Sequence, residues 1–371
     1  MTSLFEHIFI DSEVTDLRIP EHVQAAFPDQ SIIKIKGFEN IKQYIDRKDS
    51  KSIINSGKKI LYLNNYKGDV VKYCPATSKG DYLCCDLHTI NLMSNCVYNC
   101  TYCILQACLT NPVMQVHCNL DHVFSELDKF DHRISETMRI CTGEVADSLA
   151  LDDILQQNKY LVEYFSRSKN LYLELKTKSD SIDNLLPLDP KGRTVVSFSL
   201  NPADVVDKIE LHTASLEKRL KAARELLGSG YHVAFNIDPV LYYEGWQKDY
   251  EGLFQELKCR FKPGELAWLH VGLLRYIPGL AGIARQRFPG IKIFDQEFVQ
   301  GPDKKYRYPK PVRDEMYAFL YKHISEWDVH LPIYACVEQS NHWRKYREDV
   351  PLNSREVNQR VLNRLRPTRK L

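Results

Sequence analysis

Three cysteines stand close together at Cys96, Cys100 and Cys103, with a C-x3-C-x2-C spacing. Three thiolates this close can wrap one cuboidal iron–sulfur cluster, whereas four cysteines complete an ordinary ferredoxin-type site. Because the local run has no fourth ligand, the spacing predicts a [4Fe-4S] cluster with one open iron. The alternative is a set of buried thiols or a zinc site that draws extra sulfur from Cys108 and Cys118, although zinc knuckles prefer two ligand pairs separated by a long loop.

An aromatic residue, Tyr102, directly precedes the third cysteine. With it the segment resembles the radical S-adenosylmethionine (SAM) signature, C-x3-C-x-aromatic-C. The resemblance implies that the open iron binds the amino and carboxylate groups of SAM, and that the reduced cluster cleaves SAM to a 5′-deoxyadenosyl radical. Reduced flavodoxin or ferredoxin is then the expected electron donor.

Five further stretches carry a more specific pattern between about residues 90 and 255. They are Val116–Asp121, Ile140–Glu144, Thr177–Leu186, Phe198–Asn201 and Pro239–Tyr250. Their order and spacing resemble those of the spore photoproduct lyase family of DNA-repair enzymes. The resemblance implies a radical SAM lyase that reverses a thymine photoproduct in DNA carrying that lesion.

The same resemblance implies roles for single residues. Cys141 matches the cysteine that donates a hydrogen atom to the product radical, and a thiol suits that role because its S–H bond is weak. Tyr102 matches one of two tyrosines that relay the hydrogen atom, whereas Ile104 stands where the second is expected. The residues expected to contact SAM are Glu144, Lys178, Ser199 and Asn201.

Several of these residues have a plainer alternative. Cys141 could pack as a small apolar residue, and Lys178 and Ser199 could be solvated loop residues. Gly143 and Glu144 replace the Ser-Asp pair of the spore enzymes. A glycine lets the backbone approach SAM closely and a carboxylate can accept its amino group, so this pair supports SAM binding without specifying thymine chemistry.

Short strand-like runs alternate with helical patterns through the middle of the chain, which indicates a parallel βα repeat. The expected strands are 138–141, 170–177, 194–200, 231–238, 267–274 and 291–298, and the expected helices 151–166, 215–227 and 247–258. We predict an α/β fold: a partial (β/α)6 TIM-like barrel of the radical SAM type at 88–298, an N-terminal α/β extension at 1–87 and a basic C-terminal segment at 299–371. In such a barrel the chemistry gathers at the carboxyl ends of the strands.

The C-terminal segment carries the positive charge of the chain. Residues 301–371 hold 15 Lys and Arg against 9 Asp and Glu, although the whole chain has a formal net charge of only +2. Charge runs are often solvated helix faces, but one run matches the region where the lyase family contacts DNA phosphates. Its candidate DNA-binding residues are Lys304, Lys305, Arg307 and Tyr308.

The composition of the chain limits the other classes of protein to which it could belong. The chain has 371 residues, of which 44% are hydrophobic, and no run is long enough to span a membrane. Eleven cysteines without a secretion signal indicate reduced thiols and a cytoplasmic location. Two alternatives to the lyase stay open: a radical SAM enzyme of the same family that acts on another lesion or a small molecule, and a non-catalytic iron–sulfur or zinc protein that binds nucleic acid.

Overall fold

The computed structural model describes residues 4–74, 82–336, 338–339, 345–346, 351 and 353–365. The part of the predicted basic end at 337, 340–344, 347–350, 352 and 366–371 therefore lies outside the described residues. No helix in the described ranges is both long and apolar enough to cross a membrane.

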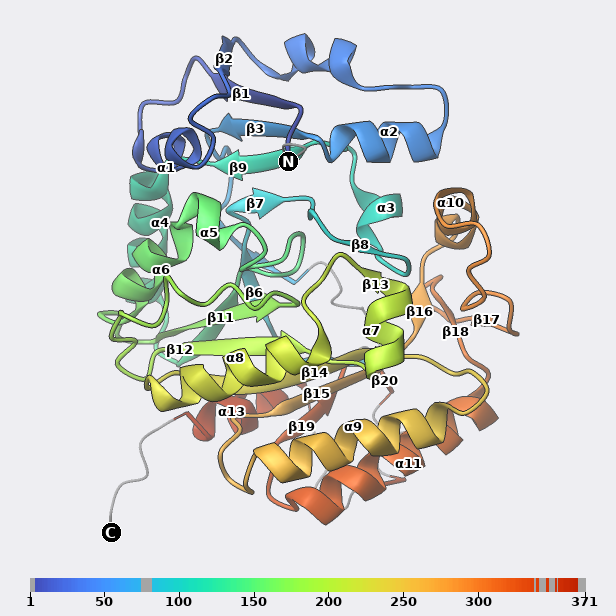
Figure 1. Cartoon of the computed structure of the whole chain (residues 1–371). Coiled ribbons are helices and arrows are strands. Elements are labelled where there is room, and N and C mark those ends of the chain that lie inside the picture. The colour runs from blue at the N-terminus through green and yellow to red at the C-terminus, as the bar shows by residue number, and fades with distance from the viewer. Residues whose placement is uncertain are drawn as a thin grey trace.

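The larger sheet has eight strands in the order β19-β15-β14-β12-β11-β10-β6-β4. Every neighbouring pair is parallel except β4 and β6, and helices lie on its outer side (Figure 1). This curled, open barrel confirms the predicted α/β class. The strands are β4 (Val71–Tyr73), β6 (His88–Ile90), β10 (Met138–Cys141), β11 (Leu171–Thr177), β12 (Thr194–Ser199), β14 (His232–Val240), β15 (Leu269–Leu273) and β19 (Ile333–Ala335).

The second sheet lies at the top of Figure 1, in the order β2-β1-β3-β9-β7. Its strands are β1 (His7–Asp11), β2 (Ile32–Ile35), β3 (Ile60–Asn64), β7 (Met93–Ser94) and β9 (Met114–His117). The two sheets exchange segments, because β4 precedes residue 87 yet joins the barrel, whereas β7 and β9 follow it yet join the second sheet. Likewise β19, beyond residue 298, forms an edge of the barrel. The predicted boundaries at 87 and 298 are therefore not boundaries between sheets.

Helices follow the predicted pattern where their apolar spacing is strong. The predicted helix 215–227 is α8 (Leu216–Gly228), whose first turn is capped by the Ser215 hydroxyl accepting the Lys218 N–H at 3.3 Å. The predicted helix 151–166 is broken in two at Gln156, which has a φ of 49°. The helices are α1 (Arg18–Ala26), α2 (Ser50–Gly57), α3 (Leu105–Cys108), α4 (Leu120–Arg133), α5 (Asp152–Leu155), α6 (Gln157–Phe165), α7 (Ala203–Ile209), α8, α9 (Trp246–Arg260), α10 (Leu280–Arg287), α11 (Lys310–Trp327) and α13 (Ser354–Asn363), with a 3-10 helix at Phe38–Tyr44.

The predicted strand at 291–298 is wrong. Its alternating apolar residues suit a strand, but the backbone there forms successive turns, with the Ile291 N–H donating to the Phe288 carbonyl and the Asp295 N–H to the Lys292 carbonyl. Short pairings complete the fold. They are β5 (Tyr82–Leu83) with β20 (Glu338–Gln339), β8 (Asn99–Cys100) with β13 (Glu210–Leu211), and β16 (Arg275–Tyr276) and β17 (Val299–Gln300) on either side of β18 (Tyr306–Arg307).

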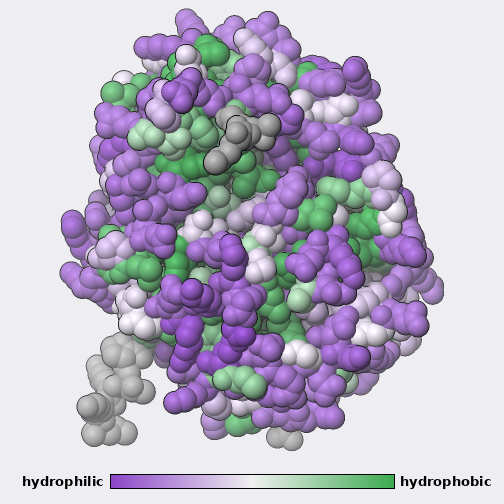
Figure 2. Space-filling model, in the orientation of Figure 1, coloured by the Kyte–Doolittle hydropathy of each residue, from purple (hydrophilic) through white to green (hydrophobic). Residues whose placement is uncertain are grey.

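The visible surface is mostly hydrophilic, with small apolar areas between the polar side chains (Figure 2). Single exposed apolar residues are ordinary on folded proteins. The larger apolar side chains that are exposed are Leu4, Leu17, Ile33, Tyr44, Tyr73, Ile104, Val299 and Val329. Ile104, which follows the third cysteine, is therefore turned partly to solvent.

Candidate active site

The three cysteines lie on the loop that leaves the N-terminal sheet and reaches the barrel. Cys96 follows β7, Cys100 ends β8, and Cys103 precedes α3. The pairing of β8 with β13 attaches the loop to the segment after α7. The Cys103 N–H donates to the Cys100 carbonyl at 3.1 Å, which closes a turn between the second and third cysteines.

Asn95 turns the chain into this loop. Its φ of 73° lies in the left-handed region, which asparagine enters more readily than most residues. The side-chain oxygen accepts the Cys96 N–H at 2.8 Å, and the side-chain amide donates to the Pro112 carbonyl at 2.5 Å. The Asn95 N–H donates to the Val145 carbonyl at 2.9 Å, so the loop is tied to the segment that follows β10.

Gln106 holds the other end of the loop. Its side-chain amide lies 3.3, 3.1 and 3.2 Å from the carbonyl oxygens of Cys100, Thr101 and Cys103. One buried side-chain amide therefore binds the carbonyl groups of the second cysteine, the residue after it and the third cysteine. The cysteine side chains are left as the free ligand groups of the loop.

The cysteine loop fits a cluster better than a single zinc ion. The three sulfur atoms do not all lie within 4.8 Å of one another, whereas Zn–S bonds of about 2.3 Å hold tetrahedral ligand sulfurs about 4 Å apart. Burial raises the pKa of Cys96 to about 12 and that of Cys100 well above its usual value, while Lys58 opposes the first shift and Lys178 the second. Three thiols beside positive charge suit an anionic iron–sulfur cluster.

Tyr102 lies in a buried hydrogen-bond network. Its hydroxyl donates to Glu210, whose carboxylate also accepts from Arg219 at 2.7 Å and from the Asn201 amide at 2.9 Å. The Tyr250 hydroxyl donates to the Asn201 side-chain oxygen at 2.8 Å. The network brings together Tyr102 and Asn201, both singled out from the sequence, and adds Glu210 and Arg219, which were missed because no motif marks them.

We expect Glu210→Ala to lower the free energy of unfolding by roughly 3–5 kcal/mol, because it leaves the fully buried Arg219 without its carboxylate partner. Urea denaturation followed by circular dichroism measures the change. Glu217→Ala is the matched control, since Glu217 pairs with Arg260 at the surface and its loss should change stability little. Equal destabilisation in the two variants would contradict a special role for the buried pair.

Lys178 and Ser199 lie at the carboxyl ends of β11 and β12, where the sequence places them. The Lys178 N–H donates to Asp147 at 2.6 Å, and its ammonium lies 5.8 Å from the centre of the Tyr102 ring. The Ser199 carbonyl accepts from Arg219 at 2.7 Å. Both are partly buried and held by neighbours, so they are not freely solvated loop residues.

Glu144 forms a partly buried ion pair with Lys176 of β11, and the Cys74 thiol lies 3.5 Å from its second carboxylate oxygen. Although burial raises the pKa of Glu144, the charge of Lys176 holds it below its usual value. Close packing leaves no room for a side chain at Gly143, the residue before Glu144. A Cβ at Gly143 would lie 2.6 Å from the Lys176 Cβ and 2.8 Å from the Lys176 carbonyl oxygen. The structure thus explains Gly143 by the close approach of β11.

We expect Gly143→Ala to destabilise the fold by about 1–3 kcal/mol, because the new methyl group overlaps the backbone of the neighbouring strand. Gly228→Ala is a suitable control: no atom lies within 4 Å of the place that its methyl group would take, and alanine should leave stability unchanged or raise it slightly. Thermal denaturation compares the two variants. A wild-type melting temperature for Gly143→Ala would contradict the packing explanation.

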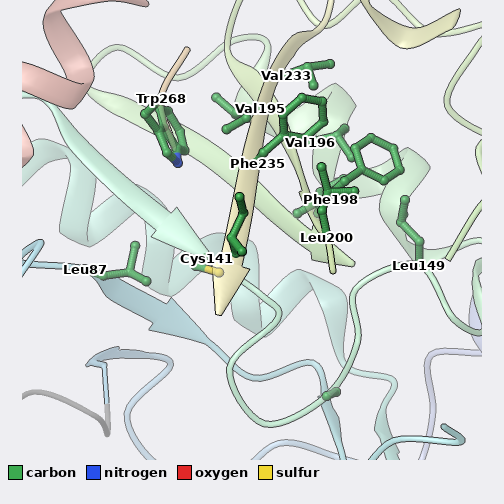
Figure 3. Packing of buried hydrophobic residues seen from close by; sticks show 14 of the residues in the cluster. Leu87, Cys141, Leu149, Val195, Val196, Phe198, Leu200, Val233, Phe235 and Trp268 are labelled. Atoms are coloured by element: carbon green, nitrogen blue, oxygen red, sulfur yellow. The ribbon is translucent and has the colours of Figure 1, made fainter. Parts of the chain in front are cut away.

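Cys141 ends β10 and has no exposed surface. Cys141 belongs to the same hydrophobic core as Leu87 and Trp268 (Figure 3), and the charges that act on its thiol are those of Lys176, Glu174 and Glu144. Burial raises the pKa of the thiol, and the Gly143 N–H lies 3.4 Å from the sulfur. Cys141 therefore keeps its proton at neutral pH, which a hydrogen-atom donor requires.

A second polar cluster lies on the neighbouring strands. Arg275 binds both carboxylate oxygens of Asp238, at 3.1 and 3.0 Å. His270 lies 3.5 Å from Asp238, and the ligand atoms of Asp238, His270 and Cys336 are all within 4.8 Å of one another. Burial lowers the pKa of His270 to about 3, so its ring is neutral. Sequence reasoning missed this cluster, whose only signal is single polar residues within apolar strands.

The four residues predicted to bind DNA divide into two pairs. Lys304 is exposed at the turn between β17 and β18, and the Lys305 ammonium lies 3.7 Å from Asp303. Arg307 is buried and donates to both Asp303 oxygens at 2.8 Å, while Tyr308 is 1% exposed. Arg307 and Tyr308 therefore do not reach the surface, because the hairpin uses them for its own packing.

A groove of about 990 Å³ lies between α7, residues 241–244 and residues 287–296. Thr101 of the loop and Glu244 line this groove. Trp246 does not, since it is 2% exposed and packs edge to face on Phe319 with ring centres 4.9 Å apart. The Glu-Gly-Trp run therefore contributes one groove residue and one core residue.

Known proteins resemble this chain in sequence. A model of the spore photoproduct lyase family matches residues 80–334. The spore photoproduct lyase of Geobacillus sp. (strain Y412MC61) is 31% identical over 210 residues, which cover 56% of this chain and 62% of that protein. The spore photoproduct lyase of Clostridium acetobutylicum is 26% identical over 246 residues, which cover 64% of this chain and 73% of that protein.

Solved structures resemble it in fold. A spore photoproduct lyase complexed with dinucleoside spore photoproduct superposes with a TM-score of 0.76 at 24% identity, covering 89% of this chain and 98% of that one. A mutant lyase with bound AdoMet and dinucleoside spore photoproduct gives 0.76 at 23% identity, covering 90% and 99%.

Proposed function

The chain belongs to the spore photoproduct lyase family, and from that premise we propose that it is a radical SAM lyase that reverses a thymine photoproduct in DNA. The observation that carries the proposal is the meeting of two groups at one end of the barrel. The three-cysteine loop is tied by the Asn95 N–H to the Val145 carbonyl, in the segment that directly follows Cys141. The proposed cluster loop is thereby joined to the chain just beyond the carboxyl end of β10, the strand that Cys141 ends.

Cys96, Cys100 and Cys103 would hold the cluster, with Glu144, Lys178, Ser199 and Asn201 as the proposed SAM contacts. When bound, cluster and SAM supply a 5′-deoxyadenosyl radical that takes a hydrogen atom from the lesion.

Cys141 then donates its hydrogen atom to the thymine radical that remains after bond scission. Its burial favours this role, since a thiol that stays protonated has the S–H bond to give. Donation leaves a radical on the Cys141 sulfur, and Tyr102 would relay to that sulfur a hydrogen atom from the nucleoside. Burial together with Glu210 raises the pKa of Tyr102, so the phenol keeps its O–H.

The proposed DNA contacts are limited to Lys304 and Lys305, since Arg307 and Tyr308 are buried. Phosphate neutralisation by these lysines should make affinity fall as salt rises. A lesion in a duplex must also leave the base stack to reach the barrel.

Anaerobic reconstitution with iron and sulfide, followed by reduction with dithionite, tests the proposal. We expect 5′-deoxyadenosine to form from SAM, and thymine to be restored in a dinucleotide or DNA that carries the spore photoproduct. Undamaged DNA is the control substrate. A protein that holds its full cluster and cleaves SAM but leaves the lesion untouched would rule out this substrate.

Ile104 favours a second candidate, a family member that acts on another lesion or on a small molecule. It stands where the second relay tyrosine is expected, and its side chain is 38% exposed. Salt-sensitive binding to DNA separates the two candidates, because a small-molecule enzyme has no need of it. Absence of any SAM cleavage by the reduced, iron-loaded protein would instead support a non-catalytic nucleic-acid-binding protein.

A further inference from the structure

Lys58 reaches the cysteine loop from the N-terminal sheet. It follows α2, whose last residue, Gly57, lies so close to Pro112 that a Cβ there would be 2.6 Å from the Pro112 carbonyl oxygen. No side chain fits between them, so the end of the helix is pressed against the segment that follows the cysteines. Lys58 is thereby directed into the loop.

Two cations converge on one amide in that loop. The Lys58 ammonium donates to the Tyr98 carbonyl and, at 3.0 Å, to the Asn99 side-chain oxygen. Arg287, at the end of α10, donates to the same Asn99 oxygen at 2.9 Å and to the Gln106 side-chain oxygen. The residues between the first and third cysteines are therefore held from two sides by positive charge.

The cysteines are the groups that could offset the burial of these two cations. Burial lowers the pKa of Lys58 and that of Arg287, whereas thiolates at Cys96, Cys103 and Cys100 would raise the first and a thiolate at Cys103 would raise the second. Neither cation forms a salt bridge with a carboxylate in the described part of the chain. Lys58 also lines a cavity of about 160 Å³ together with Cys96 and Cys103. A half-buried lysine and a buried arginine without carboxylate partners indicate that negative charge is carried by what the cysteines bind.

We propose that Lys58, supported by Arg287, is a positioning residue that sets the reduction potential of the cluster held by the three cysteines. Reduction adds one electron and so one negative charge to the cluster, while the external donor loses one electron and no bond is made or broken. A nearby cation favours the more negative state, more strongly where water is excluded. Lys58 lies between α2 and β3, before the residues 80–334 that match the family model, so the N-terminal part of the chain supplies this positive charge. The inference rests on the cluster in the proposed function and not on the substrate.

Potentiometric titration of the reconstituted full chain, followed by electron paramagnetic resonance of the reduced cluster, tests the proposal. At a fixed solution potential we expect Lys58→Gln to lower the ratio of reduced to oxidised cluster by about tenfold, a fall of about 59 mV for one electron. Lys58→Arg keeps the charge and should stay near the wild type. Lys59→Gln is the matched control, since Lys59 pairs with Glu6 at the surface.

The variants distinguish an effect of the Lys58 charge on the reduction potential from a structural effect of Lys58 on cluster loading. A Lys58→Gln protein with full iron content and an unchanged potential would overturn the proposal. If Lys58→Gln does not load iron, Arg287→Gln is titrated instead, and a potential equal to the wild type would overturn it as well. Failure of Lys58→Arg to load would also overturn it, by showing that only the shape of the lysine matters. Thymine restoration is not measured, so a wrong substrate leaves this result intact, whereas a wild type without a cluster would refute the cluster assignment.

Discussion

Cys100→Ala is expected to abolish the cluster and, with it, SAM cleavage. Cys100 is the middle one of the three proposed ligands, is 7% exposed and ends the strand that attaches the loop to β13. Loss of one thiolate leaves two ligands, which cannot hold three corners of a cluster. Because changes outside the ligand shell already cost 10–100-fold in affinity or activity, we expect a loss of more than about 100-fold. Iron content, visible absorbance and 5′-deoxyadenosine formation measure it.

The control for this variant is Cys108→Ala. Cys108 lies in α3, just beyond the loop, and its side chain is exposed, so its removal should leave the cluster intact. A comparable loss of iron and of 5′-deoxyadenosine formation in Cys108→Ala would indicate that Cys108 is a metal ligand and would favour the zinc alternative. A fully loaded Cys100→Ala protein would refute the assignment of the three ligands.

Cys141→Ala is expected to separate SAM cleavage from repair. The variant keeps the three cysteine ligands, so 5′-deoxyadenosine should still form, but the thymine radical would have no adjacent S–H bond. We expect restored thymine to fall by at least about tenfold, a barrier increase of about 1.4 kcal/mol, with new side products. Liquid chromatography of the reaction products measures both outcomes.

Cys118→Ala controls for the loss of a buried sulfur. Cys118 is also fully buried, but it follows β9 in the N-terminal sheet and not a strand of the barrel. Both variants should lose about 1 kcal/mol of stability from the missing apolar contact. Unchanged repair by Cys141→Ala would refute the donor role, and equal loss of repair in Cys118→Ala would attribute the effect to stability.

The helices and strands that could be predicted are those in which the local spacing of apolar residues shows which side chains are buried. The strands at 138–141 and 194–200 and the helix at 215–227 were predicted almost to the residue, because their apolar residues face one core. Short strands carry too few residues for such a signal, so β4, β7 and β9 could not be assigned to a sheet. The segment 291–298 has the alternation of a strand but no neighbour to pair with, and it forms turns.

The sequence by itself predicted the three-cysteine loop as the cluster site and Cys141 as the candidate donor. Three cysteines within one turn-rich loop meet whatever the remaining fold does, because the chain between them is too short to separate them. The spacing therefore carried the cluster prediction, and Cys141 at the end of a predicted strand carried the donor prediction.

Only the tertiary structure decided which charges surround these groups. Asn99 and Arg287 are 188 residues apart, and Tyr102 and Glu210 are 108 apart. No local spacing encodes such pairs, since they depend on how sheets and helices dock. The structure also turned Arg307 inward, although in sequence it stands in a basic run, because its guanidinium donates to Asp303 four residues before it and to the Tyr82 hydroxyl 225 residues away. The sequence shows which residues are charged, but the tertiary packing decides which residues they bind.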